Sequence, residues 1–204
     1  SHALWRRGAE TKLRLRLKRL PRRLSGPTGG VAAVATLSFI GIGGWCFINT
    51  HVWNQYHTQN GDELHAVDLE RQLLPYERTP QPAVTMVRAK VDLWPHQRKV
   101  VASGTLDLVN RHAAPLSEVH LRMRDPDTKL AALAVSGASL AKDYSRFQYR
   151  IYRFAKPLPP GARAQIAFTT VRQQVGFRNE GNDQSLVDNG TLLRNTALLP
   201  TVGM

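Results

Sequence analysis

The sequence predicts a mainly β protein: an antiparallel β-sandwich-like domain preceded by one transmembrane α-helix. Two observations support this fold class. A charge-free and mostly apolar stretch runs from Leu24 to Gly61 of the 204-residue chain. Beyond Pro82, apolar and polar residues alternate with period two, in runs that are separated by turn residues. Such runs, recurring about every ten to fifteen residues, are typical of strands in an antiparallel sandwich.

The apolar stretch has the length of a membrane span, because a helix needs about 20 apolar residues to cross a bilayer. Trp45, Trp53 and Tyr56 gather at its C-terminal end. Aromatic rings of this kind favour the membrane interface. We therefore assign residues 26–53 to a transmembrane helix.

A cleaved export signal and a buried soluble helix compete with a membrane span for this stretch. An export signal would be shorter and would end in small residues, whereas this run ends in "CFINTHVW". A buried helix of a soluble protein would rarely extend so far without one charge. Gly41, Gly43 and Gly44 also give the helix a small-residue surface, which suits packing against other membrane helices.

The basic charge of the chain is concentrated in residues 1–25. The first 23 residues contain nine Lys or Arg side chains and one acid, Glu10, so +8 of the formal net charge of +13 lies there. We interpret this block as a cytoplasmic segment on anionic lipid, with Arg22 and Arg23 at the membrane interface. It predicts no nucleic-acid partner.

The positive-inside rule predicts a cytoplasmic N-terminus and an external β-domain. In a bacterium the anchor would lie in the inner membrane and the β-domain in the periplasm. The lone cysteine, Cys46, excludes a disulfide within the chain. A domain without cysteine is compatible with that location.

Residues 54–82 are predicted to be a linker with a short amphipathic helix. Leu64, Val67, Leu69 and Leu73 have roughly the spacing of one helical face, and a proline ends the pattern.

Residues 83–204 are predicted to form the extracytoplasmic β-domain. In its first run, "AVTMVRAKVDLW", Val87, Ala89, Val91 and Leu93 share one face, opposite charged residues. The segment "KLAALAVSGASL" is ambiguous. Near the C-terminal end, Asn189-Gly190 lies between two apolar runs, which predicts a hairpin.

Motifs that carry chemistry are missing from the sequence. It contains no His-Glu-x-x-His, Gly-x-Ser-x-Gly, Walker loop or dinucleotide fingerprint. Asp125, Asp127 and Asp143 could attract a cation, but "RDPDTK" favours a turn. We therefore predict no catalytic residue and no metal ligand in this chain.

One block resembles a known family. Residues 76–123, "YERTPQPAVTMVRAKVDLWPHQRKVVASGTLDLVNRHAAPLSEVHLRM", resemble the start of the N-terminal β-domain of the aminopeptidase N family of zinc metallopeptidases. The segment "VDNGTLLRNTALLPTVGM" is similar to the join between that domain and the catalytic one. The order of span, linker and β-domain resembles bacterial membrane proteins that fuse an ABC-type permease region to such a peptidase.

The resemblance implies a non-catalytic domain that positions a catalytic domain and lines its substrate cleft. Asn189 and Thr191 are the cleft candidates. It implies zinc in a catalytic domain beyond Met204 and no cofactor here. Its partners would be the bilayer, that downstream domain and other transmembrane helices, and whether the parent is an active enzyme stays open.

Two alternatives remain. The chain could be a single-span membrane protein whose β-sandwich binds a protein or glycan partner, or a fragment of an exporter permease.

Overall fold

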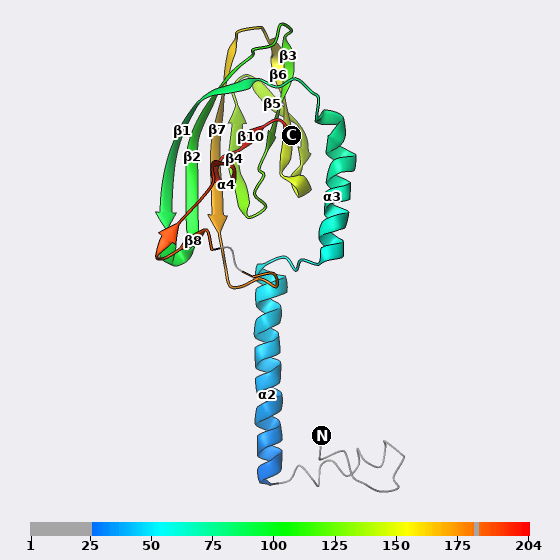
Figure 1. The fold of residues 1–204 in the computed structure, drawn as a ribbon, viewed down its shortest axis with the longest axis vertical. Helices are drawn as coiled ribbons and strands as arrows, with labels where there is room; N and C mark the ends of the chain where they lie inside the picture. Colours follow the sequence, from blue (N-terminus) through cyan, green and yellow to red (C-terminus); the bar gives the residue numbers. More distant parts are fainter. Residues whose placement is uncertain (1–25, 182–183) are drawn as a thin grey trace. The chain divides into compact units, whose positions relative to one another are not determined.

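The computed structural model describes residues 26–181 and 184–204, and the chain divides into two units between Gln55 and Tyr56. The first unit contains α2 (Pro27–Phe47) and the π-helical turn η1 (Ile48–Trp53). The second contains the β-domain (Figure 1). Its elements are α3 (Gln59–Leu73), η2 (Leu74–Tyr76), β1 (Ala83–Trp94), η3 (Pro95–Gln97), β2 (Lys99–Val109), β3 (Leu116–Arg122), β4 (Thr128–Val135), β5 (Ala138–Tyr144), η4 (Ser145–Phe147), β6 (Tyr149–Leu158), β7 (Arg163–Gln173), β8 (Leu186–Val187), β9 (Gly190–Thr191), α4 (Asn195–Leu198) and β10 (Thr201–Val202). The predicted fold class is confirmed.

Helix α2 is long and apolar enough to cross a membrane. Its 21 α-helical residues extend about 32 Å, close to the thickness of a bilayer's hydrocarbon layer. Two hydroxyls bond back to the helix: Thr36 Oγ1 donates to the Ala32 carbonyl at 2.8 Å and Thr50 Oγ1 to the Cys46 carbonyl at 2.9 Å. A helix of this kind near an N-terminus fits a membrane span or a signal anchor.

The predicted interfacial residues lie partly within the described structure. The rings of Trp45 and Trp53 meet edge to face, with centroids 5.7 Å apart. Tyr56 begins the second unit and its side chain is exposed. Arg22 and Arg23 lie outside the described residues.

Two four-stranded antiparallel sheets form the β-domain. The first has the order β1-β2-β7-β4 and the second the order β10-β3-β6-β5, with a small β8-β9 hairpin beside them. In Figure 1, β1 and β2 stand at one side of the domain and α3 at the other. The segment whose sequence was ambiguous forms β4 and β5, which are joined by a turn with Gly137 at φ 68°.

The main core lies between the two sheets. Its buried members come from β2, β4 and β7 of the first sheet and from β3 and β6 of the second. Leu106, Ile166 and Val119 are typical, with exposed fractions of 2% or less. They occupy alternate positions along their strands, as expected for sheets that bury one face.

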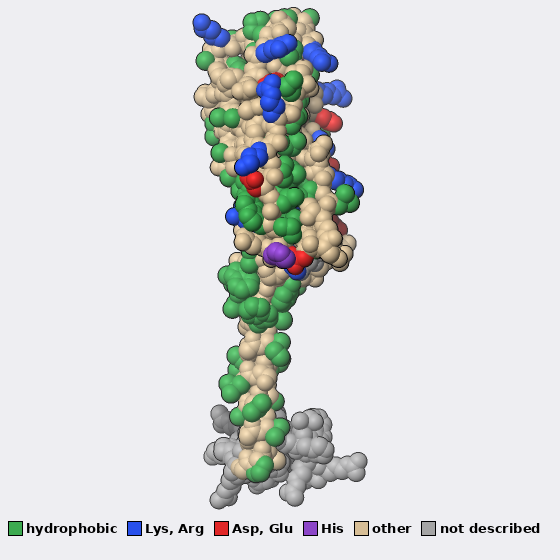
Figure 2. All heavy atoms as spheres, turned by 90° about the vertical axis from the view of Figure 1, so that its left-hand side faces the viewer, with side chains coloured by type: hydrophobic (Ala, Val, Ile, Leu, Met, Phe, Trp, Pro, Cys, Tyr) green, Lys and Arg blue, Asp and Glu red, His purple; other side chains and the backbone are tan. Residues whose placement is uncertain are grey.

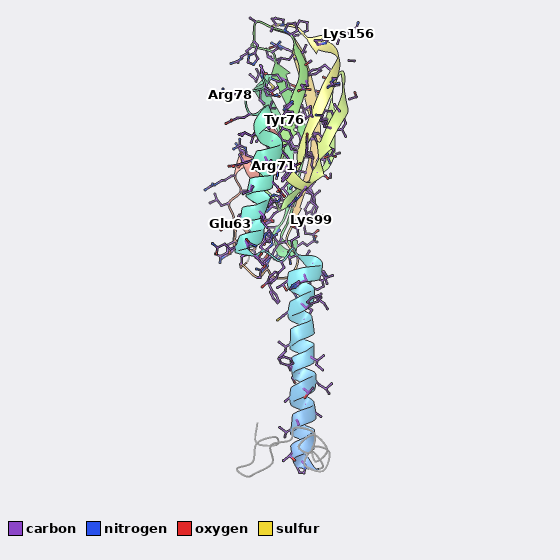
Figure 3. The ribbon with its side chains drawn as sticks, turned by 90° about the vertical axis from the view of Figure 1, so that its right-hand side faces the viewer. Glu63, Arg71, Tyr76, Arg78, Lys99 and Lys156 are labelled. Atoms are coloured by element: carbon purple, nitrogen blue, oxygen red, sulfur yellow. The ribbon has the colours of Figure 1, made fainter. Side chains whose placement is uncertain are left out.

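Helix α3 covers the other face of the second sheet, where Leu73 packs with Phe147, Tyr149 and Ile151. Thr58 begins the helix as its N-cap, with its side chain accepting a hydrogen bond from the Gly61 amide. Figure 3 looks onto this side of the domain. Three layers result: helix, second sheet and first sheet.

The predicted single apolar face of α3 is wrong. Leu69 and Leu73 face the sheet, whereas Leu64 and Val67 are 58% and 59% exposed. The reason is geometric: Leu64 and Leu73 are nine residues apart, which is about 180° around a helix at 3.6 residues per turn. Leu64, Val67 and Leu74 form a second, outward stripe.

The predicted hairpin near the C-terminal end exists, with its turn one residue earlier than expected. Val187 pairs with Gly190, so Asp188 and Asn189 form the two-residue turn. Gly190 is the first residue of β9. The predicted turn in "RDPDTK" is also present: the Asp127 amide donates to Asp125 Oδ1 at 2.8 Å and the Thr128 amide to the Asp125 carbonyl at 3.3 Å.

Candidate docking surface on strand β1

Strand β1 has one face on the same side as the sandwich core. Across the β1–β2 ladder, Val87 pairs with Leu106, Val91 with Ala102 and Leu93 with Val100. Residues opposite each other in a ladder point to the same side of the sheet. The β2 partners are buried, so the β1 side chains continue the same apolar layer beyond them.

The second sheet leaves this continuation uncovered, because no β1 residue is a buried member of the core cluster. Four large apolar side chains on this face are 40–46% exposed: Val84, Val87, Val91 and Leu93. We call these four residues the β1 strip. Single exposed apolar residues are ordinary, whereas a contiguous set marks an interaction site.

Gly104 of β2 allows β1 to approach closely at the middle of the strip. A Cβ atom there would lie 2.0 Å from the carbonyl oxygen of Arg88 and 2.8 Å from the Cα of Ala89. Contacts of that length are impossible for a side chain. The glycine therefore permits the local backbone path of β1, as glycine inside a strand commonly does.

The opposite face of β1 is charged. Arg88 and Lys90 project there with side chains 62% and 76% exposed, and each pairs with one acid, Arg88 with Asp107 at 3.3 Å and Lys90 with Asp92 at 3.2 Å. Figure 2 looks onto this edge of the domain and shows hydrophobic side chains with Lys and Arg scattered around them and fewer acids. The surface is apolar with a mainly basic border.

Away from β1, one buried histidine has a structural role. His120 is fully buried; its Nδ1 lies 2.5 Å from the Tyr149 hydroxyl and its Nε2 lies 3.0 Å from Glu118 Oε1. The His120 amide donates to Gln81 Oε1 at 2.8 Å, and its carbonyl accepts from the Gly203 amide at 2.9 Å. One residue therefore joins the segment that precedes β1 to the segment that follows β10.

Three polar groups lie together beyond the end of α3, and one of them, the Tyr76 ring, meets His120 edge to face. The hydroxyls of Tyr76 and Tyr144 are 2.9 Å apart, and Lys142 Nζ donates to the Tyr76 oxygen at 3.0 Å. The hydrogen bond with Tyr144, followed by that from Lys142, lowers the pKa of Tyr76. The same bonds raise the pKa of Tyr144 and of Lys142. Tyr76 is labelled in Figure 3, beyond the end of α3.

The aspartates that could have attracted a cation bind the chain's own arginines. Arg172, with 4% of its side chain exposed, forms ion pairs with Asp125 and, at 3.5 Å, with Asp127. Arg178 also reaches Asp127, at 2.7 Å. Asp143 pairs separately with Arg150 at 3.2 Å. The described residues contain no group of three or more His, Cys, Asp or Glu placed for a metal ion.

The predicted cleft residues lie on the β8–β9 hairpin and both are exposed. A cavity of about 290 Å³ lies near this hairpin, lined in part by Ser185, Leu192 and three arginines, Arg124, Arg172 and Arg194. Neither Asn189 nor Thr191 lines it. Their role in a substrate cleft stays a prediction.

The alternating sequence pattern identified the two faces of β1. It gave no indication that the apolar face is exposed to solvent. The alternation of Val87, Ala89, Val91 and Leu93 with charged residues predicts a half-buried strand. Only the extent of the second sheet decides whether that face is covered.

No protein-family model matches the chain, and no curated protein matches its sequence. Among solved structures, it is similar to an M1 zinc metallopeptidase from Deinococcus radiodurans, with 16% identity and a TM-score of 0.36 over 47% of this chain and 21% of that one. The chain thus spans about a fifth of that protein's length.

It is also similar to chitin-binding domains. One is ChBD2 from Thermococcus kodakarensis KOD1, with 14% identity and a TM-score of 0.25 over 46% of this chain and 81% of that one. Another is the chitin-binding domain of a chitinase from Pyrococcus furiosus, with 17% identity and a TM-score of 0.25 over 55% of this chain and 99% of that one. Similarities this weak assign neither a family nor a function.

Proposed function

We propose that this chain is a membrane-anchored, non-catalytic β-domain that holds a second protein domain at the membrane surface. The observation that carries the proposal is the β1 strip. A contiguous exposed apolar surface beside the core marks an interaction site. His120 and the three candidate aspartates, Asp125, Asp127 and Asp143, bond to other side chains of the domain. These residues therefore have structural roles, which suits a domain that binds a partner and does not catalyse a reaction.

We propose the catalytic domain of a zinc metallopeptidase as the partner. The support is the sequence resemblance of residues 76–123, a block that contains β1 itself. Under this proposal zinc belongs to the partner, where it would act as a Lewis acid in peptide hydrolysis. The chain supplies position and one wall of the substrate cleft, with Asn189 and Thr191 as candidates.

The membrane arrangement is part of the same proposal. The basic residues before α2 favour a cytoplasmic N-terminus and a periplasmic β-domain at a bacterial inner membrane. Within the described residues, nothing lies within 4 Å of a Cβ atom built on Gly41, Gly43 or Gly44. This open surface of α2 supports packing against further membrane helices, such as those of an ABC-type permease.

A glycan is the competing ligand. All four residues of the β1 strip are aliphatic. Trp94, the aromatic residue at the end of β1, pairs with Lys99 on the opposite face, and the Lys99 ammonium lies 5.3 Å from its ring centroid. Sugar rings stack on aromatic faces, whereas aliphatic side chains pack against other aliphatic side chains. The composition of the strip therefore favours a protein partner.

The first test uses the reading frame that encodes the chain. We expect a His-Glu-x-x-His motif downstream of Met204. The domain that carries it, purified separately, should bind the full chain in detergent micelles, and this chain alone should not hydrolyse an aminoacyl reporter.

The docking site is tested by matched variants. Val91→Lys should weaken binding of that domain, whereas Leu140→Lys, at another exposed position on a different strand, should not. Equal binding by both variants would show that the contact lies elsewhere. A chain that bound stoichiometric zinc and cleaved the reporter by itself would contradict the non-catalytic role.

Topology has its own test. Protease added to intact spheroplasts should remove the β-domain and spare the N-terminal segment. Protection of the β-domain would reverse the proposed orientation.

A further inference from the structure

We propose that the partner binds β1 by strand addition, with an extended segment, apolar on one face and acidic on the other, pairing along the strand's free edge. This inference rests on the proposed function, because it takes the β1 strip as the docking surface. It adds the mode of binding and the chemistry of the segment that binds.

The first support is the length of the free edge. β1 is the last strand of the first sheet, and among the described residues no strand pairs with its outer side. Its 12 residues extend about 40 Å at 3.3 Å per residue. The other edge strands are shorter: β4 has eight residues, β5 has seven and β10 has two.

Proteins usually blunt exposed strand edges with charged side chains, with proline, with short strands or with bulges. β1 carries Arg88, Lys90 and Asp92 but has no proline, and its one bulge, between Val84 and Met86, lies at its start. Seven successive residues from Val87 to Leu93 thus pair regularly with β2 on one side. On the other side they present an intact row of backbone donors and acceptors.

The second support is the apolar face beside that edge. A strand that paired with β1 would place alternate side chains next to Val87, Val91 and Leu93, about 5 Å away on the same side of the sheet. Apolar residues there would cover the uncovered part of the core layer. Main-chain bonds and side-chain burial would then act together, which is how strand addition gains both affinity and specificity.

The third support is charge. The intervening side chains of the added strand would lie beside Arg88, Lys90 and Asp92. Arg88 and Lys90 are mostly exposed, and each also pairs with an acid, Arg88 with Asp107 and Lys90 with Asp92. Opposite charges on neighbouring strands attract and like charges repel. The bound segment is therefore one that alternates apolar with polar residues and places acidic residues opposite Arg88 and Lys90.

A second copy of β1 fits this edge less well. In the two antiparallel two-fold registers that overlap nearly the whole strand, the axis passes through Arg88 or Ala89. The first register sets Arg88 against Arg88, and the second sets Arg88 against Lys90. Both place like charges directly opposite, which destabilises the pair.

The test uses the full chain in detergent micelles and a short fluorescent peptide that alternates valine and glutamate. Its binding is measured by fluorescence anisotropy. We expect saturable binding to the wild type, and a loss of about tenfold in affinity for Arg88→Glu/Lys90→Glu, because two attractive cross-strand pairs become repulsive. A peptide that alternates valine and lysine should recover the affinity for that variant.

Main-chain pairing is tested with two N-methylated forms of the valine–glutamate peptide. Their methyl groups block alternate amides in opposite phase. The peptide whose methylated amides face β1 has lost the donors that pair with the strand, and it should not bind. The peptide whose methylated amides point away from β1 should bind as the unmethylated peptide does. Equal effects of the two phases, or no binding of the parent peptide, would overturn strand addition.

Two comparisons separate this inference from the proposed function. Suppose that Val91→Lys weakens binding of the downstream domain but the two N-methylated peptides bind equally well. The β1 strip is then the docking surface, and strand addition is wrong. If the wild-type chain dimerises and Val91→Lys makes it monomeric while Leu140→Lys does not, a second copy occupies the edge. That result would contradict the acidic-segment proposal.

Discussion

The Tyr149 hydroxyl and the Nδ1 atom of His120, 2.5 Å apart, are buried where helix α3 meets the second sheet. The Glu118 carboxylate lies 3.0 Å from the other ring nitrogen. A carboxylate accepts hydrogen bonds, so Nε2 donates to Glu118, and Nδ1 shares a hydrogen bond with the Tyr149 hydroxyl. Both ring nitrogens of a fully buried imidazole are thus satisfied.

Tyr149→Phe should destabilise the β-domain by about 1–3 kcal/mol, because it leaves a buried ring nitrogen of His120 without its hydrogen-bond partner. Urea unfolding of the full chain in detergent, followed by near-ultraviolet circular dichroism, measures the change. Tyr144→Phe is the control, since its hydroxyl bonds to Tyr76 at the partly buried border of the same cluster. A cost no greater than that of the control would show that the His120–Tyr149 bond does not contribute.

Stability should fall as pH rises above about 10, the ordinary pKa of tyrosine. Burial raises the pKa of Tyr149 and also that of Tyr152. Above pH 10 the unfolded chain loses these protons while the folded chain keeps them, so folding becomes less favourable as pH rises. Urea midpoints from pH 8 to about 11 test this, and Tyr149→Phe should flatten the decline. An unchanged slope in that variant would assign the pH dependence to other groups.

Asp125→Asn should destabilise the domain by about 3–5 kcal/mol, because it leaves the buried Arg172 guanidinium short of a counter-charge. The matched control is Asp143→Asn, which breaks the more exposed pair with Arg150 and should cost at most about 1 kcal/mol. Thermal unfolding of the two variants side by side gives the comparison. Similar melting temperatures would mean that Asp127 alone is enough to hold Arg172.

The two faces of α3 should respond differently to the same substitution. Leu73→Ala should cost about 2–5 kcal/mol, because Leu73 is fully buried and its loss leaves a cavity. Leu64→Ala, on the exposed stripe, should change stability by less than about 0.5 kcal/mol. Urea midpoints of the two variants decide between this arrangement and the single apolar face that the sequence suggested, which would make their costs alike.

Local patterns predicted most of the strands and one hairpin. The alternation from Val87 to Leu93 identified the faces of β1, and the apolar run identified α2. The prediction of a single apolar face on α3 was wrong. Its four positions, Leu64, Val67, Leu69 and Leu73, match the spacing of one helical face only approximately. The helix instead divides them between sheet and solvent. The hairpin turn shifted by one residue, because Gly190 pairs with Val187 and leaves Asp188 and Asn189 in the turn.

Long-range partners had no local signal. His120 and Tyr149 are 29 residues apart and Arg172 and Asp125 are 47 apart, so no short motif connects them. The exposure of β1 was equally hidden. Periodicity shows which side chains share a face, but the coverage of that face depends on where a second sheet ends.

The uncovered edge of β1 has a consequence for how the protein matures. Until a partner covers it, a long strand edge beside apolar side chains can pair with an exposed strand of another, incompletely folded chain. A partner domain joined by a short flexible linker would meet it at an effective concentration of about millimolar, well above that of most separate proteins. Covalent linkage would therefore protect β1 from aggregation during synthesis as well as position the partner afterwards.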